Sequence, residues 1–480
     1  MVLIAHAQVQ DRYDAVIAGS GFGSLFFLHG LLQRQPRARC LIVEWGAFRD
    51  HGWQLANQRN TDIDCATTFR TRAGEKPWNF TIGFGGGTNC WWAQTPRLTP
   101  SDFRLRSTYG VGDDWPISYD DLEPYYVAAE QIMLIAGDDR IGKVHPRSAP
   151  YPQPPHALSS IDLIMQAAMP DHHFAAPTAR LSRAVGRRGA CCSTASCDIC
   201  PVEAKATVWN TFERLIAAEN VHILPNARVT SVDVSANSAR ALVYEVDGRV
   251  HAARGDIVVV GCNAVHSPFI LMRSGLSHPA LGAYLHEKRV LKFEVLLDGL
   301  DNFDGGNPRP ALNMAWADGE HRRDCGGAIV YFVNDFQVNG LRTEWGRWRQ
   351  TLPLEAFVED IPLEENRIVD DGGDTPIVHH AKRSQYCDRG AARVHARLPE
   401  LLRPLPVEWI VFNGEAATGS HIQGTCRMGS DPDSSIVDGG LVHHRVRNLV
   451  VVGTSVWPSC STANPSLTAA ALSLRAAAML

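Results

Sequence analysis

The hydrophobic pattern of the first 50 residues combines two short apolar runs with one helical repeat. Residues 14–18 and 40–43 are almost entirely apolar, as in strands that are buried on both faces. Between them lie a glycine-rich turn at 19–24 and an apolar helical stretch at 25–32. Strand, glycine turn, helix and strand in this order predict a βαβ unit of a parallel sheet.

The glycine turn has the composition of a dinucleotide-binding fingerprint. It reads Gly19-Ser20-Gly21-Phe22-Gly23-Ser24, and the second strand ends at Glu44. Glycines let the backbone approach a pyrophosphate at a helix N-terminus, and the acidic residue binds the adenosine ribose. Ser24 replaces the third glycine of the fingerprint, which loosens the helix packing without excluding the site. The alternative is a glycine turn in some other βαβ unit.

Later segments predict a second sheet. Further helices are expected at 121–135, 208–218, 267–274 and 467–480, and further strands at 221–224, 228–234, 241–246 and 256–260. From about 283 to 410, strand-like runs such as 291–297 and 327–333 alternate with charged, glycine-rich turns, which favours an antiparallel sheet in a second domain. Residues 136–180 have little periodicity and predict a loop or lid. The expected fold class is α/β (α+β), with a Rossmann-like domain and an antiparallel second domain.

Length and charge narrow the functional classes. With 480 residues, 45% of them hydrophobic, the chain is too long for one ordinary domain. A net charge of −5 gives no electrostatic case for nucleic acid or an anionic membrane. The chain has no run of about 18 apolar residues, so we expect no membrane-spanning helix. Residues 1–5 lack the features of a secretory signal. We therefore expect a cytoplasmic protein.

A second glycine-rich stretch occupies residues 83–92. It contains Gly85-Gly86-Gly87-Thr88, followed by Asn89-Cys90-Trp91-Trp92. Consecutive glycines are needed where the backbone passes close to a large flat group or takes positive φ. We expect that group to be the isoalloxazine ring of a flavin.

Four of the 12 cysteines lie within ten residues, at Cys191, Cys192, Cys197 and Cys200. Thiolates converging from one tight loop that ends in Cys-Pro are typical of iron–sulfur ligation. Zinc is a weaker alternative, because no histidine is nearby and adjacent cysteines suit a tetrahedral site poorly. Structural or redox-active thiols are the other alternative.

The C-terminal region carries a histidine and an asparagine in a setting that suits alcohol oxidation. His421 precedes the turn Gly424-Thr425, and Asn464 follows an apolar strand and a proline. A neutral imidazole can take a hydroxyl proton while the adjacent carbon gives up a hydride. Asn464 would bind the same oxygen. The alternative is that His421 is a loop histidine and that Asn464-Pro465 starts the last helix.

These motifs occur together in the order found in one protein family. The glycine fingerprint is followed by motifs at 85–88, 114–118, 359–367, 424–432 and 464–468. Together they resemble the glucose-methanol-choline (GMC) flavoprotein oxidoreductases, over residues 14 to 480. The resemblance implies FAD, a flavin domain built from non-contiguous segments, and a substrate domain with an antiparallel sheet. It also implies that His421 and Asn464 form the catalytic pair.

The resemblance divides the chain into segments. FAD-binding segments are expected at 1–105, at 181–282 with the cysteine cluster, and at 411–480 with the catalytic residues. A substrate or lid segment is expected at 106–180, and the substrate-domain sheet at 283–410. The implied FAD contacts are Gly19, Gly21, Phe22, Gly23, Glu44, Gly86, Gly87, Asn89, Cys90, Trp91, Val229, Gly453, Thr454, Asn464 and Pro465.

Within the family, the chain is similar to pyranose oxidases and to bacterial FAD-dependent sugar dehydrogenases. Gly453 stands where many relatives carry an aspartate. Cys90 stands where pyranose oxidases carry the histidine that bonds to the flavin, so we expect dissociable FAD, with a cysteinyl bond as the alternative. The cysteine cluster resembles a 3Fe-4S site at Cys191, Cys192 and Cys197. The resemblance implies a 3Fe-4S centre in preference to a 4Fe-4S centre, and Cys200 departs from the pattern because the last gap is two residues and not three.

The expected function is FAD-dependent oxidation of a hydroxyl group of a sugar, glycoside or amino sugar. His421 accepts the proton, Asn464 fixes the oxygen, and hydride passes to flavin N5. With a cluster, electrons leave to an acceptor protein or a small partner subunit. Export together with such a subunit would place this protein in the periplasm, which is the alternative to the cytoplasm. Without a cluster, the enzyme is an oxygen-using oxidase. The rivals are an NAD(P)-dependent dehydrogenase and a non-catalytic flavin- or cluster-binding protein.

Two sets of residues are candidates for substrate contact. Trp91, Trp92 and Trp457 could present flat surfaces to a sugar ring, although tryptophans are more often core residues. Glu359 and Asp360 could bind an amine, but we expect them at a solvated strand edge.

Overall fold

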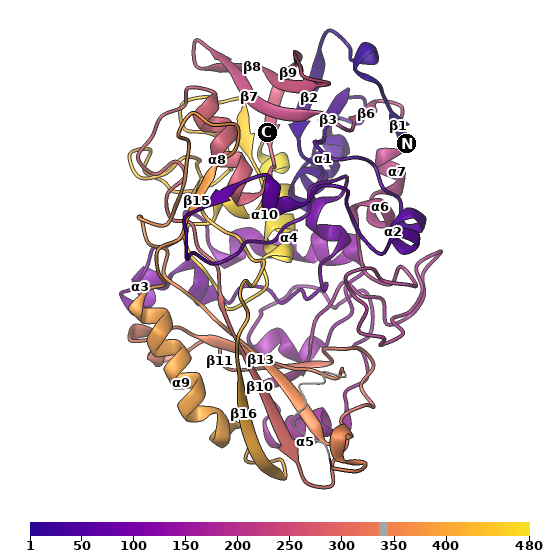
Figure 1. Ribbon diagram of the computed structural model, residues 1–480, viewed down its shortest axis with the longest axis vertical. Coiled ribbons are helices and arrows are strands. Elements are labelled where there is room, and N and C mark those ends of the chain that lie inside the picture. Colours follow the sequence, from indigo (N-terminus) through magenta and orange to yellow (C-terminus); the bar gives the residue numbers. More distant parts are fainter. Residues whose placement is uncertain (336–343) are drawn as a thin grey trace.

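Three sheets organise the computed structural model, which describes residues 1–335 and 344–480. An eight-stranded sheet occupies the upper part of the molecule in Figure 1, and a six-stranded sheet the lower part. Helices α4 and α10 lie between them in this view. The predicted fold class, a Rossmann-like α/β region joined to an antiparallel sheet, is confirmed.

The eight-stranded sheet contains the nucleotide-binding unit predicted from the sequence. Its order is β1-β6-β3-β2-β9-β8-β7, and β17 also pairs with β9. The strands are β1 (Val2–Leu3), β6 (Val221–Leu224), β3 (Cys40–Val43), β2 (Tyr13–Ala18), β9 (Arg249–Val260), β8 (Ser238–Val246), β7 (Arg228–Ser235) and β17 (Leu449–Val451). The pairs from β1 to β9, and that of β17 with β9, are parallel, whereas β9, β8 and β7 form an antiparallel ribbon.

The apolar runs of this sheet are buried because helices cover it. Residues Ala15 to Ala18 of β2 have no exposed surface. Helix α1 (Phe22–Arg34) packs against α10 (Ser466–Met479), which also contacts α4 (Tyr119–Met133). Gly30 permits the close contact between α1 and α10, since a Cβ atom at this position would lie 2.8 Å from Cβ of Ala477. This packing holds the C-terminal helix against the glycine turn.

The six-stranded sheet is antiparallel throughout, in the order β16-β10-β13-β12-β11-β5. Its strands are β16 (Val407–Glu415), β10 (Arg289–Leu297), β13 (Thr351–Val358), β12 (Ala328–Phe332), β11 (Ala311–Trp316) and β5 (His173–Ala175). Helix α9 (Gln385–Leu401) contributes Val394 and Leu398 to the core of this region. The prediction of a loop over 136–180 is wrong in part, because this segment supplies β5 and helix α5 (Ser160–Ala168).

A small third sheet and several short helices complete the described fold. The third sheet has the order β14-β15-β4, with β14 (Arg367–Val369), β15 (Ile377–His379) and β4 (Arg70–Thr71). The remaining α-helices are α2 (His51–Asn57), α3 (Leu105–Tyr109), α6 (Val208–Thr211), α7 (Glu213–Ile216) and α8 (Asn263–Arg273). The helix predicted at 208–218 is thus two short helices, because the backbone leaves helical geometry at Phe212.

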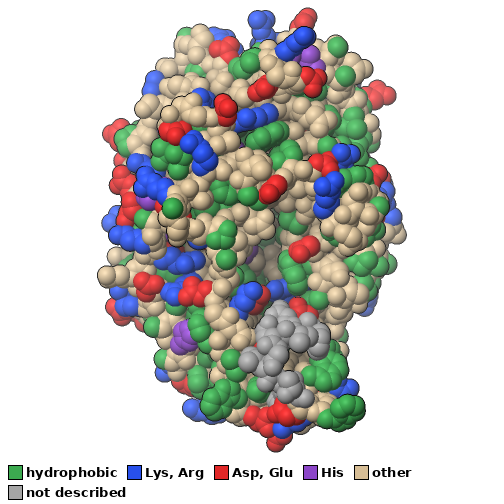
Figure 2. All heavy atoms as spheres, in the orientation of Figure 1, with side chains coloured by type: hydrophobic (Ala, Val, Ile, Leu, Met, Phe, Trp, Pro, Cys, Tyr) green, Lys and Arg blue, Asp and Glu red, His purple; other side chains and the backbone are tan. Residues whose placement is uncertain are grey.

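The surface agrees with the low net charge. On the face shown in Figure 2, acidic and basic side chains are interspersed without a large patch of either sign. Within residues 1–335 and 344–480, no helix is both long enough and apolar enough to cross a bilayer.

Candidate active site

A large cavity opens at the carboxyl ends of the parallel strands, where the glycine turn follows β2. It encloses about 1720 Å³, including the part open to solvent. Its lining includes most of the residues expected to contact FAD: Gly19, Gly21, Phe22, Gly23, Glu44, Gly86, Gly87, Val229, Gly453 and Thr454. Ligands of open parallel sheets bind at this edge.

The glycines leave the room that a dinucleotide needs. A Cβ atom built at Gly21 or Gly87 would meet no atom within 4 Å, so both backbones face open space. Gly453 is equally open and has φ of +94°, which favours glycine. The N-terminus of α1 follows Gly21 and provides backbone donors for a pyrophosphate. The cavity therefore fits FAD.

Gly23 takes the packing role of the third fingerprint glycine. A Cβ atom at Gly23 would lie 2.9 Å from the backbone nitrogen of Gly453, so only glycine lets α1 approach this part of the chain so closely. Ser24 instead directs its Oγ toward Gly261, where an added Cβ would lie 2.3 Å away. The substitution at residue 24 therefore leaves the close packing of the turn intact.

Glu44 holds the two glycine-rich stretches together. Ser20 donates to Glu44 Oε2 from its backbone nitrogen at 3.1 Å and from its hydroxyl at 2.6 Å. Ser20 Oγ in turn accepts from Gly85 N at 2.9 Å. Burial raises the pKa of the Glu44 carboxyl, while these donors lower it. The side chain expected to bind ribose thus also fixes the cavity wall.

A second cavity adjoins the first and contains the predicted catalytic pair. It encloses about 2010 Å³, again including space open to solvent, and shares Thr88 and Thr454 with the nucleotide cavity. The predicted cofactor, catalytic or substrate residues that line it but not the nucleotide cavity are His421, Asn464, Pro465, Cys90, Trp91 and Trp92. A flavin bound in the first cavity would therefore meet a substrate in the second.

His421 and Asn464 face one another in this second cavity. Asn464 Nδ2 lies 3.3 Å from His421 Nε2. Tyr331 on β12 donates its hydroxyl proton to Asn464 Oδ1 over 2.6 Å, so the amide presents its NH₂ group to the imidazole. An NH₂ group only donates, so Nε2 of a neutral His421 carries the lone pair. The sequence analysis did not identify Tyr331.

The surroundings of His421 keep its imidazole neutral. Burial, and next the positive charge of Lys288, lower the pKa of His421 well below 6.5. Lys288 is fully buried, and its Nζ has no hydrogen-bond partner among the described residues. A neutral imidazole whose Nε2 lone pair faces the Asn464 amide in the cavity is a competent proton acceptor at neutral pH.

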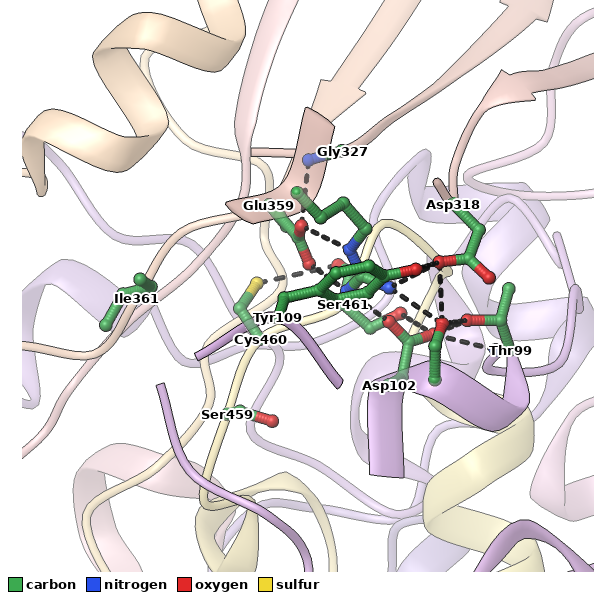
Figure 3. Close-up of polar contacts among 12 residues, drawn as sticks. Thr99, Asp102, Tyr109, Asp318, Gly327, Glu359, Ile361, Ser459, Cys460 and Ser461 are labelled. Carbon is green, nitrogen blue, oxygen red and sulfur yellow. Dashed lines mark hydrogen bonds and ion pairs between the residues drawn. The ribbon is translucent and has the colours of Figure 1, made fainter. Parts of the chain in front are cut away.

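A buried ionic network, part of which Figure 3 shows, anchors the loop that precedes Asn464. Arg322 donates to Asp102 Oδ1 at 2.7 Å and to Glu359 Oε2 at 2.6 Å. Ser461 Oγ donates to Asp102 Oδ2 at 3.1 Å and accepts from Ala463 N. The loop just before Asn464 is therefore tied to the centre of the molecule.

The same network corrects one prediction. Glu359 and Asp360 are only 1% and 3% exposed, so the expected solvated strand edge is wrong. Arg322 balances the charge of Glu359, and Ser384 N donates to Asp360 Oδ1 at 3.2 Å. A buried carboxylate is stable only with such partners.

The residues after the second glycine run lie in different environments. Asn89 donates from its side chain to Phe84 O at 2.8 Å and lines a separate small cavity. Cys90 lies 3.1 Å from Thr81 Oγ1, and burial raises the pKa of its thiol. Trp91 lines the second cavity, whereas Trp457 is fully buried.

The clustered cysteines gather around one cavity of about 280 Å³ without forming a metal site. Cys191, Cys192, Cys197 and Cys200 all line it. Arg180 Nη1 lies 3.1 Å from the Cys197 sulfur. Over the described ranges, however, no three His, Cys, Asp or Glu side chains are placed to hold a metal ion. The described side chains therefore give no support to the predicted iron–sulfur cluster.

Lys205 links this cysteine loop to the second glycine-rich stretch, residues 83–92. Its Nζ donates to Asn89 O at 2.6 Å, to Asp198 O at 3.0 Å and to Cys197 O. Burial lowers the pKa of Lys205 to about 8, against the opposing effect of nearby thiols. The loop is therefore fixed beside the active site.

Comparisons with known proteins agree with this geometry. The chain is 27% identical to the fructose dehydrogenase large subunit of Gluconobacter japonicus, over 97% of both chains. It is 29% identical to 6'''-hydroxyparomomycin C oxidase of Streptomyces lividus, over 83% of this chain and 78% of the relative. The structure of pyridoxine 4-oxidase from Mesorbium loti superposes with a TM-score of 0.70 at 18% identity, covering 97% of this chain and 99% of that one.

Family models match the chain directly. The N- and C-terminal models described as GMC oxidoreductase match residues 81–290 and 404–473. These ranges include the second glycine run, His421 and Asn464. The chain therefore belongs to the GMC oxidoreductases, FAD-dependent enzymes that act on CH–OH groups.

Proposed function

We propose that the protein oxidises a hydroxyl group of a sugar, glycoside or amino sugar to a carbonyl, with His421 as the base. The observation that carries this proposal is the His421 and Asn464 pair in a cavity that adjoins the nucleotide cavity. The named activities of the relatives, which include fructose dehydrogenase and aminoglycoside oxidases, support the substrate class.

The side chains divide the work of the reaction. His421 Nε2 takes the hydroxyl proton, and Asn464 Nδ2 donates a hydrogen bond to the same oxygen, which orients the carbon that loses hydride. Tyr331 holds the Asn464 amide in the required direction. The bound flavin supplies the hydride acceptor. The glycine-lined cavity would hold this flavin.

The experiment that tests the proposal is anaerobic reduction of the flavin. Purified protein is mixed with a panel of monosaccharides, and bleaching of the flavin band is followed. We expect wild type to be bleached and His421→Ala to retain FAD but react about 100-fold more slowly or worse. His395→Ala on α9, outside both cavities, should behave as wild type. Equal rates for His421→Ala and wild type would refute the role of the base.

The route by which electrons leave is a separate question. An iron–sulfur relay at Cys191, Cys192, Cys197 and Cys200 rests on the cysteine pattern alone, and an electron-acceptor protein or partner subunit depends on it. The alternative is an oxidase that uses oxygen and whose cysteines are structural. Iron and acid-labile sulfide analysis decides: about three or four irons per chain support the relay, and a pure flavin spectrum without iron supports the oxidase.

A further inference from the structure

One row of side chains crosses three strands of the six-stranded sheet beside the catalytic pair. Tyr331 on β12 pairs in register with Glu355 on β13, which pairs with Lys292 on β10. Paired residues project from the same face of a sheet. Since Tyr331 reaches Asn464, Glu355 and Lys292 project toward the same side, and all three line the cavity of His421. The backbones of Tyr331 and Glu355 lie on neighbouring strands, which are about 5 Å apart.

Glu355 is paired with a buried arginine on the wall of this cavity. Arg309 donates to Glu355 Oε2 from Nε at 3.0 Å and from Nη2 at 2.6 Å. The guanidinium lies over the ring of Trp92, with its carbon 4.0 Å from the ring centre. Arg309, Glu355 and Trp92 all line the cavity. The pair is therefore held rigidly at the place where substrate binds.

Two polar atoms of the pair are left without partners. Arg309 is only 8% exposed, and its Nη1 has no hydrogen-bond partner in residues 1–335 and 344–480. Both Arg309 contacts use Oε2, and no described residue donates to Oε1 of Glu355, whose side chain is 13% exposed. A buried donor such as Arg309 Nη1 normally has a hydrogen-bond partner. A free donor beside a free acceptor on a cavity wall points to a ligand that supplies both.

We propose that Arg309 and Glu355 recognise a second hydroxyl-bearing part of the substrate. Nη1 donates to one substrate oxygen, and Oε1 accepts from a hydroxyl beside it. This inference rests on the proposed function and specifies its substrate as a polyhydroxylated compound. Because the two charges of the pair compensate each other, the pair itself offers no net charge to an ionic group and suits neutral hydroxyl groups.

The test compares a sugar with a monohydric ring alcohol. Anaerobic flavin reduction is measured for D-fructose, D-glucose and cyclohexanol in wild type, Glu355→Gln and Arg309→Lys. For the better sugar we expect KM to rise about 10- to 100-fold in each variant, as for loss of a hydrogen bond to a charged group. The kcat for the sugar and both constants for cyclohexanol should change less than about 3-fold, because His421 and Asn464 are unaltered.

A matched control removes a comparable ion pair elsewhere on the same sheet. Glu415 pairs with Arg289 across β16 and β10, and neither residue lines the cavity. Glu415→Gln should leave KM for the sugar unchanged. FAD content and thermal midpoint are measured for every variant. If Glu355→Gln does not fold, Arg309→Lys, which keeps the charge but loses the planar fork, gives the answer.

The other outcomes separate the inference from the proposed function. The role of the pair is overturned if KM for the sugar is unchanged in both variants, or if KM rises equally for the sugar and for cyclohexanol. A wild-type enzyme that prefers cyclohexanol overturns the substrate class but leaves alcohol oxidation by His421 intact. If none of the three compounds reduces the flavin, the proposed sugar oxidation fails and the inference fails with it.

Discussion

Tyr331 and Asn464, 133 residues apart in the sequence, form a hydrogen bond of 2.6 Å. The bond joins the antiparallel sheet to the C-terminal segment beside the nucleotide cavity. Through it, a strand that binds no cofactor sets the direction of an amide that faces His421. The antiparallel sheet thus contributes to the geometry of the predicted catalytic pair as well as to the wall of the second cavity.

Replacing Tyr331 by phenylalanine should slow the reaction without weakening cofactor binding. The ring would keep its edge contact with Phe357, whose centre lies 5.3 Å away, while Asn464 would lose the partner that orients it. Loss of one hydrogen bond corresponds to about 1 kcal/mol, so we expect kcat for flavin reduction to fall about 5- to 10-fold, with KM nearly constant. Stopped-flow spectroscopy measures both constants.

The control for this variant is Tyr126→Phe, which removes a buried hydroxyl that bonds to Thr468. It should leave flavin reduction unchanged, because Tyr126 does not line the substrate cavity. A wild-type rate for Tyr331→Phe would mean that Asn464 is oriented by other contacts.

Lys288 should contribute, after burial, to the pH at which the enzyme loses activity in acid. The base must be neutral, so kcat/KM falls below the pKa of His421, which burial and Lys288 keep well below 6.5. Lys288→Met removes the charge, and the His421 pKa then rises part of the way toward 6.5. We expect the acid limb of the kcat/KM profile to move to higher pH. Lys382→Met, which alters an exposed ion pair, should not move it.

The measurement is the rate of flavin reduction at subsaturating sugar between about pH 4 and pH 8, since kcat/KM reports the free enzyme. An acid limb that stays in place, or moves to lower pH, would contradict the electrostatic role of Lys288.

The nucleotide-binding unit could be predicted because its signal is local. Residues 40–43 form an unbroken apolar run between polar residues and Glu44, and β3 has those bounds. Strand β5 could not be predicted, because its three residues become a strand only by pairing with β11. The helix expected at 208–218 is interrupted at Phe212, a break that the apolar pattern does not reveal.

The sequence pattern could not predict which side chains surround the predicted catalytic pair. Tyr331 lies in an apolar run typical of a buried strand, and only the fold brings it to Asn464. Glu355 is a single acid in another such run, which by alternation alone could face solvent. Glu359 was expected to be exposed, since its partner Arg322 lies 37 residues away in the sequence. Sequence patterns identify residue types, but pairing over long separations is set by the sheets.

Two neighbouring glycines should respond differently to alanine. At Gly21 an added Cβ meets nothing and projects into open space, whereas at Gly23 it would lie 2.9 Å from Gly453 N. We expect Gly21→Ala to keep its thermal midpoint as apoprotein but to bind FAD more weakly. Gly23→Ala should lower the midpoint, because α1 must shift away from Gly453.

The measurements are the ratio of flavin to protein absorbance after gel filtration and the thermal midpoint of the flavin-free protein. Gly52→Ala, at an exposed position of α2 where an added Cβ would meet only Asp50 Oδ1 at 3.5 Å, controls for the general cost of replacing a glycine. Equal midpoints for Gly21→Ala and Gly23→Ala would contradict the close approach of α1 to Gly453.

The buried network of Figure 3 predicts a large effect on stability from a residue outside both cavities. Arg322→Met leaves the carboxylates of Asp102 and Glu359, each only 1% exposed, without their cation. Removing one partner of a buried ion pair costs about 3–5 kcal/mol. We expect a lower urea midpoint, followed by tryptophan fluorescence, and slower flavin reduction, because Ser461 and the loop before Asn464 are bound to Asp102.

The neighbouring Arg323 gives the matched control, since its pair with Glu320 is exposed and such a pair contributes about 0–1 kcal/mol. Arg323→Met should therefore unfold close to the wild-type midpoint. Adding Glu359→Gln to Arg322→Met should recover part of the loss, because one of the two uncompensated carboxylates is then neutral. If the two single variants unfold at the same urea concentration, the network does not stabilise the fold, and the loop that carries Asn464 is held by its remaining contacts, such as the 2.7 Å hydrogen bond from Trp115 Nε1 to Ser459 Oγ.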